Sequence, residues 1–426
     1  MLGGIAQTVL NVTDTAFLAR VGEVELGASA IGGVFYFVLV MLGIGISVGA
    51  QIIIARRAGE GKKHAIGEVF DHTLILLTVF GLMLFVVGIY VTPYLYHHII
   101  KDSAVAEASI VFIHYRSYAL VFTMASFAVR ALFIGIAETR IITYNAVLCA
   151  VLNVGFDYVL IFGKLGFEPM GIKGAGIATA SAEIIAALYM FVWAFYKKGM
   201  SEYYIFKFTK IAFENFKHIL KISSPIVLQN LISMGAWFIF FVLIEKIGRH
   251  ELAISNIIRS CYMVMMTPVW GFSSACNSMV SNIIGQKKQE EVLPLVLKFV
   301  KLSLGLMSVM MAFCLLFPNV LLTLSTSDVQ LQKDAMGCYY ITIVASLIFS
   351  VSMNLLSAIS GTGNTSKAMV IEITNIVLYL GYIFVFTIIY HSSVEVVWIS
   401  EIIYWVSMGL WSYIYLRSNK WKSLAV

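Results

Sequence analysis

Apolar stretches long enough to cross a lipid bilayer recur about twelve times along the sequence. A helix of about 20 apolar residues spans the hydrocarbon core of a membrane, where only helices and closed barrels satisfy their backbone hydrogen bonds. Because 60% of the residues are hydrophobic and 12% are charged, the chain has more apolar surface than a water-soluble protein of 426 residues can bury. The sequence therefore predicts an all-α polytopic membrane protein. The expected spans cover residues 1–19, 27–55, 72–96, 109–137, 141–163, 174–196, 221–245, 252–284, 295–322, 335–360, 367–390 and 396–416.

Lysine and arginine residues concentrate in every second connection between these spans. Cytoplasmic loops of membrane proteins carry an excess of basic residues, so we expect the basic connections in the cytoplasm. An even number of spans then places both termini on the cytoplasmic side of the inner membrane. The net charge of +6 reflects this topology, and we expect no nucleic-acid partner. The basic connections carry Arg56, Arg57, Lys62, Lys63, Arg140, Lys197, Lys198, Lys207, Lys210, Lys217, Lys287 and Lys288.

The second half of the sequence repeats features of the first half. The segment Arg20–Leu26 (RVGEVEL) recurs as Lys246–Leu252 (KIGRHEL), 226 residues later. The same shift, without a gap, aligns Gly135–Thr139 with Gly361–Thr365. Two repeats of six helices enter the membrane in the same orientation, because six is even, and a pseudo-two-fold axis along the membrane normal relates them. We therefore expect two pseudo-symmetric six-helix lobes.

The expected lobes are residues 1–196 and 221–426, joined by a cytoplasmic linker of residues 197–220. Within the linker, Tyr203–Leu220 carries aromatic and aliphatic residues on one side of a helix and charged residues on the other side. This pattern is typical of an amphipathic helix that lies on the membrane surface. The position equivalent to Pro225 falls just before the first residue, so we expect the natural chain to extend further upstream.

Two predicted membrane helices carry an aspartate near their middle, Asp14 and Asp157. A charge at membrane depth costs a few kcal/mol or more and indicates a functional site. Asn153 precedes Asp157 by four residues and Asn11 precedes Asp14 by three, so each aspartate shares a helix face with an amide. Thr179 lies in a run of small residues and offers a hydroxyl group, although such runs more often serve close helix packing.

These side chains suit a proton or a small hard cation. Two carboxylates that face one cavity repel each other, so they share a proton or bind a cation together with amide and hydroxyl oxygens. The sequence predicts a cation-coupling site of Asp14, Asn153 and Asp157, with Asn11 and Thr179, and leaves the choice between H⁺ and Na⁺ open. We expect no cofactor beyond the coupling ion. The five cysteines all lie in apolar runs and form no CxxC pair, so they indicate neither disulfides nor a metal.

Other charged residues within the spans have weaker functional signals. Glu183 and Glu401 occupy equivalent positions in the two halves once one deletion is allowed, which favours an architectural role. Arg116 and Arg130 share one predicted span, where arginine reaches the membrane surface or pairs with an acid. Arg130 is a candidate for neutralising Asp157.

Four motifs resemble, in their order and spacing, the multidrug and toxic compound extrusion (MATE) family. They are Asn11–Ser29 (NVTDTAFLARVGEVELGAS), the GxGxSxGAQ of Gly43–Gln51, the GxxETR of Gly135–Arg140 and the NxxxD of Asn153–Asp157. The resemblance covers nearly the whole chain. It implies a V-shaped two-lobe transporter with a central cavity, which exports amphipathic, often cationic compounds by H⁺ or Na⁺ antiport through alternating access.

The resemblance also assigns Asp14, Asn153 and Asp157 to the family's cation site in the N-lobe. The NorM-like branch of the family carries a further acidic pair in the C-lobe, at positions that align here with Ser233 and Phe349. In its acidic sites the chain is therefore more DinF-like than NorM-like.

The second half offers no replacement for the two aspartates. The positions equivalent to Asp14 and Asp157 are Phe240 and Ile383, and Glu372 lies near the end of its predicted helix. We expect a monomer whose partners are small amphipathic organic compounds and membrane lipid.

Three other classes remain open but are less favoured. A lipid or lipid-linked oligosaccharide flippase of the same superfamily needs a large cationic cavity, and few basic residues lie within the spans. A channel needs no titratable pair deep in one lobe. An intramembrane enzyme has the least support, because the sequence contains no HExxH motif.

Overall fold

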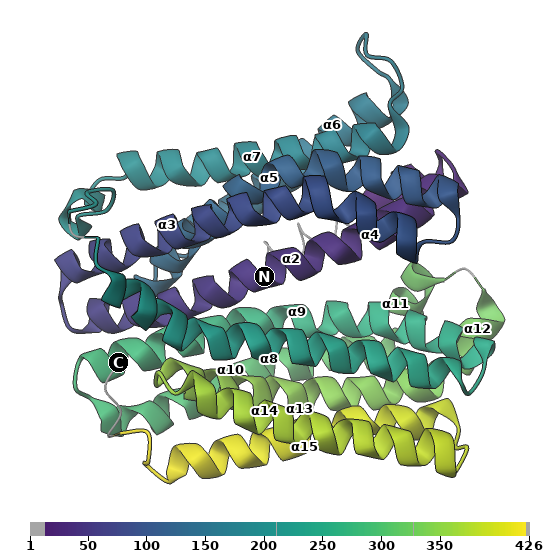
Figure 1. The fold of residues 1–426 in the computed structure, drawn as a ribbon. Helices are drawn as coiled ribbons and strands as arrows, with labels where there is room; N and C mark the ends of the chain where they lie inside the picture. Colours follow the sequence, from purple (N-terminus) through teal and green to yellow (C-terminus); the bar gives the residue numbers. More distant parts are fainter. Residues whose placement is uncertain (1–12, 210, 327, 423–426) are drawn as a thin grey trace. The chain divides into compact units, whose positions relative to one another are not determined.

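The computed structural model of the protein describes residues 13–209, 211–326 and 328–422, whose regular secondary structure is entirely helical (Figure 1). Residues 13–19 form a helical segment ahead of α2. The long helices are α2 (Glu23–Gly59), α3 (Lys63–Val86), α5 (Ser103–Gly135), α6 (Arg140–Phe162), α7 (Gly171–Tyr196), α8 (Phe213–Glu245), α9 (Arg249–Gly285), α10 (Val292–Leu316), α13 (Met336–Gly361), α14 (Thr365–Phe384) and α15 (Val394–Arg417). The short helices are α4 (Thr92–Ile99), α11 (Pro318–Ser325) and α12 (Val329–Asp334).

Within the described residues, 11 helices are long and apolar enough to span a membrane. α3 continues through a π-helical turn, Val87–Val91, into α4, so that Lys63–Ile99 forms one span. α14 continues in the same way through Val385–Ile389. Most of the predicted first span, residues 1–12, lies outside the described part of the chain. The predicted all-α, multi-pass membrane class is confirmed.

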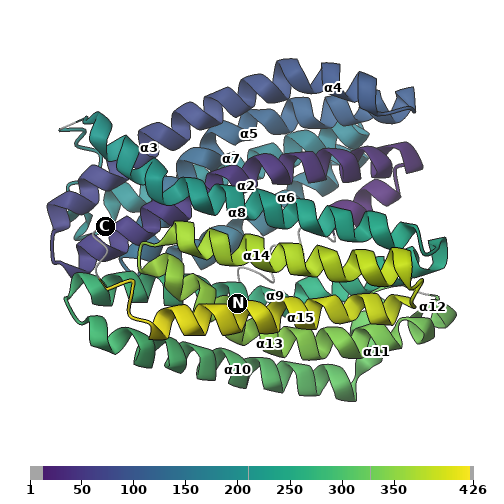
Figure 2. The ribbon, with the colours of Figure 1, turned by 60° about the horizontal axis from the view of Figure 1, so that its bottom comes forward.

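Contacts along the chain define an N-terminal unit, Met1–Val227, and a C-terminal unit, Leu228–Val426. In the N-terminal unit, α5 is the central helix and packs against α2, α3 and α7, while α6 packs on α7. In the C-terminal unit, α13 is the central helix and packs against α9, α10 and α15, while α14 packs on α15 (Figure 2). Each unit therefore repeats the same order of helix packing, as the internal sequence repeat predicts.

The repeat extends to the backbone. α2 and α9 are each 37 residues long, and their bounds differ by the same shift that aligns the sequences. The turn after each central helix contains a residue in the left-handed region, Ala137 (φ 62°) in one unit and Gly363 (φ 93°) in the other. Equivalent segments of the two halves thus adopt equivalent local structure.

A pair of equivalent glycines, Gly135 and Gly361, ends the two central helices. A Cβ atom built on Gly135 lies 2.6 Å from Ile54 Cγ2 and 3.2 Å from the Gln51 carbonyl oxygen. A Cβ atom built on Gly361 lies 2.5 Å from the carbonyl oxygen of Asn277. Small residues let membrane helices approach closely, because little hydrophobic force acts between helices in lipid. The two glycines therefore set how closely α5 approaches α2 and α13 approaches α9.

We expect Gly361→Val to destabilise the protein by about 1–3 kcal/mol, the usual cost of overpacking, because the new side chain meets the α9 backbone. Thermal unfolding of the purified protein in detergent measures this effect. Gly381→Val is the matched control, since Gly381 lies within α14 and its Cβ meets no atom within 4 Å. Equal unfolding temperatures for the two variants would contradict the close-packing role.

The prediction of one continuous span over residues 295–322 is wrong. α10 ends at Leu316 and α11 begins at Pro318, with Phe317 between them in a non-helical conformation (φ −130°, ψ 59°). Pro318 has no N–H group to continue α10 and disfavours the helical conformation of the residue before it. The helix therefore ends although the hydrophobic sequence continues.

The predicted amphipathic helix over Tyr203–Leu220 is also wrong. Residues 204–209 and 211–212 are not helical, and α8 begins at Phe213. Tyr204, Phe206 and Phe208 have positive φ angles, which no right-handed helix contains. The hydrophobic pattern of this segment therefore does not predict its backbone.

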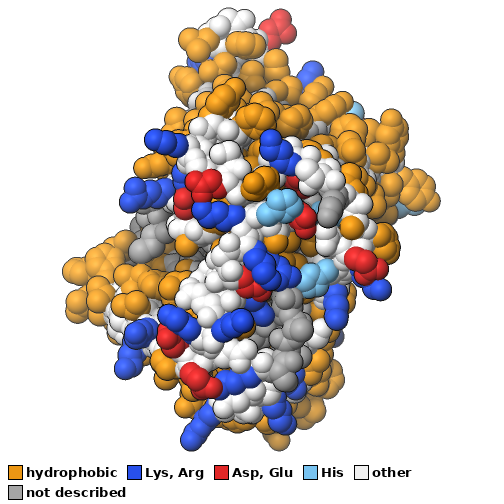
Figure 3. Space-filling model, turned by 90° about the vertical axis from the view of Figure 1, so that its left-hand side faces the viewer, with side chains coloured by type: hydrophobic (Ala, Val, Ile, Leu, Met, Phe, Trp, Pro, Cys, Tyr) orange, Lys and Arg blue, Asp and Glu red, His pale blue; other side chains and the backbone are white. Residues whose placement is uncertain are grey.

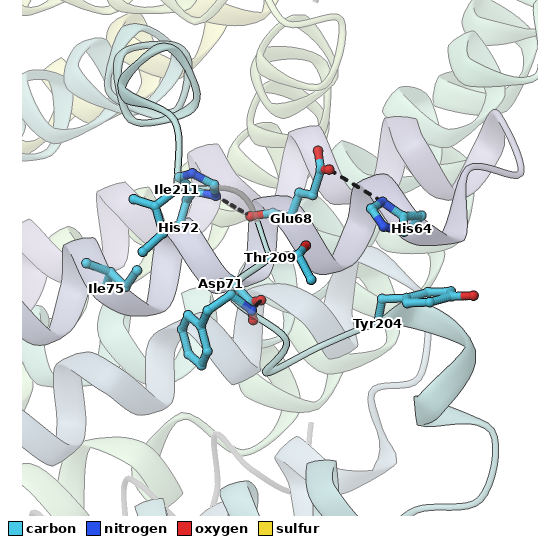
Figure 4. A pocket seen from close by; sticks show the side chains of 9 residues that line it. His64, Glu68, Asp71, His72, Ile75, Tyr204, Thr209 and Ile211 are labelled. Carbon is cyan, nitrogen blue, oxygen red and sulfur yellow. Dashed lines mark hydrogen bonds and ion pairs between the residues drawn. The ribbon is translucent and has the colours of Figure 1, made fainter.

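Side chains of α3 hold the linker instead (Figure 4). The carboxylate of Asp71 accepts hydrogen bonds from the backbone N–H groups of Phe206 and Phe208, each at 2.7 Å. The His72 ring accepts one from the N–H of Ala212 at 3.0 Å and is bonded on its other nitrogen to the Glu68 carbonyl. Backbone donors that a helix would use internally are thus used by α3, which gives the physical reason for the irregular linker.

We expect Asp71→Ala to loosen the linker, because the change leaves two backbone N–H groups without their charged acceptor. Limited trypsin digestion of membrane vesicles at the exposed Lys207 should then proceed several-fold faster than in the wild type. Glu68→Ala is the control, since the Glu68 side chain faces His64 rather than the linker backbone. Unchanged digestion of the Asp71 variant would show that the linker is held by other contacts.

Candidate cation-coupling site

Three of the predicted site residues lie together between α6 and α7. Asn153 and Asp157 are fully buried on one face of α6, and Thr179 is buried on α7. The amide Nδ2 of Asn153 donates a hydrogen bond to Thr179 Oγ1 at 3.1 Å, and the Thr179 hydroxyl donates to the Ala175 carbonyl at 2.9 Å. These two bonds fix the orientation of the Asn153 amide, so that its oxygen is left free.

Asp14 joins this group from the helical segment ahead of α2. Its carboxyl group is partly buried and interacts directly with Asp157 and Asn153. Asn11, the remaining predicted member, lies outside the described residues. Three helical segments of one unit therefore contribute to this group: the segment ahead of α2 carries Asp14, α6 carries Asn153 and Asp157, and α7 carries Thr179. Sequence spacing does not show that these three segments meet.

The oxygen atoms at the centre of this group lack hydrogen-bond donors. Among the described residues, none donates to Asp14 Oδ1, to Asn153 Oδ1 or to either carboxylate oxygen of Asp157, and all four atoms are buried. A buried polar atom without a partner costs about 1–3 kcal/mol, and more when it is charged. Two adjacent carboxylates also repel each other. A proton or a small cation between them removes both penalties.

The donor set fits a hard cation. Carboxylate and amide oxygens are the ligands that such ions prefer, and the four free oxygens are all of these types. Within the described part of the chain, no group of three or more His, Cys, Asp or Glu side chains is arranged to hold a metal ion.

An ion pair that the sequence did not reveal lies beside the site. Arg116 on α5 donates to Glu183 on α7 at 2.7 Å, and Thr123 donates to the same carboxylate at 3.0 Å. The Tyr36 hydroxyl also donates to Glu183, and the Arg116 guanidinium lies 3.8 Å from the centre of the Tyr36 ring. The positive charge of Arg116 acts on Asp14. The same charge also acts on the Asp157 carboxyl group of α6.

The proposed neutralisation of Asp157 by Arg130 is wrong. Arg130 is exposed on α5, whereas Arg116 is the basic residue whose charge acts on Asp157. One sequence signal pointed to Glu183: the repeat aligns it with Glu401, which favours an architectural role for both residues. No sequence pattern shows that Arg116 reaches α7, since that contact depends on how α5 and α7 pack.

The equivalent positions of the C-terminal unit have no cation-binding oxygens. Phe240, Tyr379 and Ile383 stand where the N-terminal unit has Asp14, Asn153 and Asp157, and all three are buried. The rings of Phe240 and Tyr379 stack with their centres 6.0 Å apart. The three positions of the C-terminal unit that are equivalent to Asp14, Asn153 and Asp157 therefore carry neither a carboxylate nor an amide.

A family model and the sequences of known proteins both resemble this chain. The family model MatE matches residues 1–159 and 225–386. The probable multidrug resistance protein NorM of Thermotoga maritima is 24% identical to the chain over 438 residues, which cover 99% of the chain and 91% of that protein. A protein of the same name from Neisseria meningitidis is 26% identical over 265 residues, or 60% of the chain and 56% of that protein.

Solved structures share the fold over almost the whole chain. An outward-facing multidrug resistance MATE family transporter of the MOP superfamily is 20% identical and superposes with a TM-score of 0.89, covering 99% of this chain and 94% of that one. A MOP superfamily transporter from Pyrococcus furiosus is 21% identical, with a TM-score of 0.90 and the same coverage. Because the family model matches most of the chain, the protein belongs to the MatE family of multi-pass membrane transporters.

Proposed function

We propose that this transporter exports small amphipathic, often cationic organic compounds in exchange for a proton or Na⁺ that binds at Asp14, Asn153 and Asp157. The observation that carries the proposal is the set of four buried oxygens that receive no hydrogen bond from the described residues, two of which belong to Asp157. Relatives named as multidrug resistance proteins support the substrate class. In its acidic sites we infer a DinF-like arrangement, although the relatives compared above carry the name NorM.

Cation binding changes the charge that holds the helices of the site. Without a cation, Asp14 and Asp157 repel each other across the interface between the first helical segment and α6. With a proton or Na⁺ bound, the repulsion disappears, and the same helices favour a closer packing. A substrate that prefers the cation-free packing is then released when the cation binds. The coupling is reciprocal, so the substrate must equally promote release of the cation.

Arg116 limits how much negative charge the site carries. Glu183 already neutralises this arginine through a direct ion pair, yet the positive charge still acts on both aspartates. We infer that Arg116 stabilises the state in which one carboxyl group is ionised and the other is neutralised. The ion pair is thus a positioning element beside the site and does not bind the coupling cation.

We infer an inner-membrane location with both termini in the cytoplasm, and a monomer. In the N-terminal unit, lysine and arginine side chains gather at the end where α2 ends and α3 begins, which faces the viewer in Figure 3. Arg56 and Arg57 lie in the last turn of α2, and Lys62 and Lys63 begin α3. An excess of basic residues at one end is typical of the cytoplasmic side.

Transport by purified protein in proteoliposomes tests this function. We expect accumulation of a cationic dye when a pH gradient or a Na⁺ gradient is imposed, and none when both gradients are abolished by ionophores. The gradient that supports accumulation identifies the coupling ion. Accumulation that persists without either gradient would overturn the antiport proposal.

A further inference from the structure

We propose that Glu372, in the C-terminal unit, is a second proton-carrying group, separate from the aspartates of the N-terminal unit. From the sequence alone, Glu372 is expected near the end of its helix, and Ser233 stands where the NorM-like branch has an acidic residue. In the structure, Glu372 is the eighth residue of α14, is 7% exposed and contacts Ser233 directly. This inference concerns a different unit and goes beyond the proposed function.

Within the described part of the chain, the side chains that form hydrogen bonds with the Glu372 carboxyl group are all neutral. Gln229 Nε2 donates to one carboxyl oxygen at 2.8 Å, and the Tyr404 hydroxyl donates to the other at 2.9 Å. The Ser233 hydroxyl contacts the same oxygen as Tyr404. α8, α14 and α15 thus all contribute to this small buried network.

No basic side chain of the described residues faces Glu372. On α15, the acidic group of Glu401 acts on Tyr404, as Glu372 does. On α14 itself, Lys367 is exposed, with its amine 5.9 Å from the Tyr415 ring. From α9, the Arg259 guanidinium lies over the Phe241 ring at 5.2 Å. An ionised Glu372 would therefore be an uncompensated charge within a membrane span, which is costly.

The number of available hydrogens links the Ser233 hydroxyl to the proton on Glu372. The Ser233 oxygen lies 2.8 Å from the carbonyl oxygen of Gln229, one turn earlier in α8, and it also contacts Glu372. A serine hydroxyl has a single hydrogen and cannot donate to both acceptors. When Ser233 donates to the Gln229 carbonyl, the hydrogen between Ser233 and Glu372 must come from Glu372. That arrangement has a proton on the carboxyl group, whereas a Ser233 hydroxyl turned to Glu372 gives the ionised group three neutral donors.

Release of that proton needs only a hydroxyl rotation. The Ser233 hydrogen turns from the Gln229 carbonyl to the carboxylate, and Gln229 Nε2 and Tyr404 continue to donate to it. A serine that bonds to the carbonyl four residues earlier bends its helix slightly. The bond to Gln229 lies one turn after Pro225, which interrupts the hydrogen bonding of α8. The protonation state of Glu372 is thereby linked to the bend of α8, the helix that runs from one unit into the other.

The repeat supports this assignment. Glu183 of the N-terminal unit has Arg116 as its partner, but the position equivalent to Arg116 in the C-terminal unit is Thr342. Glu401, which is equivalent to Glu183, accepts hydrogen bonds from two tyrosines and a tryptophan, at 2.9 to 3.1 Å. The C-terminal unit has thus kept buried carboxyl groups without the arginine that would hold such a group ionised.

Infrared spectroscopy of the purified full-length protein in lipid nanodiscs tests the proposal. A protonated carboxyl group has a carbonyl stretch that a carboxylate lacks. We expect the wild type at neutral pH to show such a component, and Glu372→Gln to lose the contribution of one carboxyl group, which appears in the difference spectrum. Glu290→Gln is the matched control in the same unit, because the Glu290 side chain is 88% exposed, and it should keep the component. Identical spectra for wild type and Glu372→Gln would overturn the proposal.

Ser233→Ala provides a second measurement that does not depend on the folding of the Gln variant. The change removes the acceptor for the Glu372 proton, so the frequency of the carbonyl stretch of Glu372 should shift. Ser260→Ala, at an exposed position on α9, is the control and should leave this frequency unchanged. A component that does not move in Ser233→Ala would contradict the hydrogen count. Both measurements use resting protein, so their outcome is independent of whether Asp14 and Asp157 couple transport.

Discussion

Asp157→Asn and Asp14→Asn should each reduce gradient-driven drug export to the level of vesicles without protein. Asn is close in size to Asp, so the packing of α6 is retained, but an amide neither takes up a proton nor neutralises a cation. The site then keeps at most one carboxylate and loses the repulsion that cation binding relieves. Uptake into proteoliposomes under an imposed gradient measures the loss, and size-exclusion chromatography confirms that the variants are folded.

Glu168→Gln is the control for these two variants. Glu168 is exposed in the connection between α6 and α7, so the change removes a carboxylate of the same region that does not belong to the buried site. Its transport should match that of the wild type. Full export by both Asn variants would place the coupling site elsewhere, with Glu183 and Glu245 as the next candidates.

Arg116→Leu should strongly destabilise the N-terminal unit. The change leaves Glu183 ionised and largely buried beside Asp14 and Asp157, without a positive charge nearby. Breaking a buried ion pair by removing one partner costs about 3–5 kcal/mol. We expect the lower end of this range, because the two side chains are 13% and 19% exposed. Thermal unfolding of the purified protein, followed by tryptophan fluorescence, measures the effect.

Two further variants distinguish the effect of breaking the ion pair on stability from the effect of losing any arginine. Arg130→Leu removes an exposed arginine from the same helix and should change stability little. The double variant Arg116→Leu/Glu183→Leu removes both charges together and should regain most of the stability that either single variant loses. Equal stabilities of Arg116→Leu and Arg130→Leu would show that the pair contributes little to the fold.

Errors in the sequence-based prediction have identifiable causes. Hydrophobicity continues through Phe317, but Pro318 ends α10 because it lacks an N–H group. The linker has the pattern of an amphipathic helix, but Asp71 binds its backbone donors. In the first case a local rule outweighs the hydrophobic pattern. In the second, a contact from a helix far away in the sequence outweighs it, and no local pattern reveals such a contact.

The membrane class, the repeat and a cation-coupling role for Asp14, Asn153 and Asp157 could all be predicted from the sequence. Each prediction rests on local properties, because apolar length, a constant shift and a charge within a span can be recognised along the chain. Which side chains meet depends on the tertiary structure. It brings Arg116 to Glu183 and Glu372 to Ser233, since side chains on different helices are placed by helix packing. Pairing decides whether a buried carboxyl group is ionised, so this part of the function became visible only in the fold.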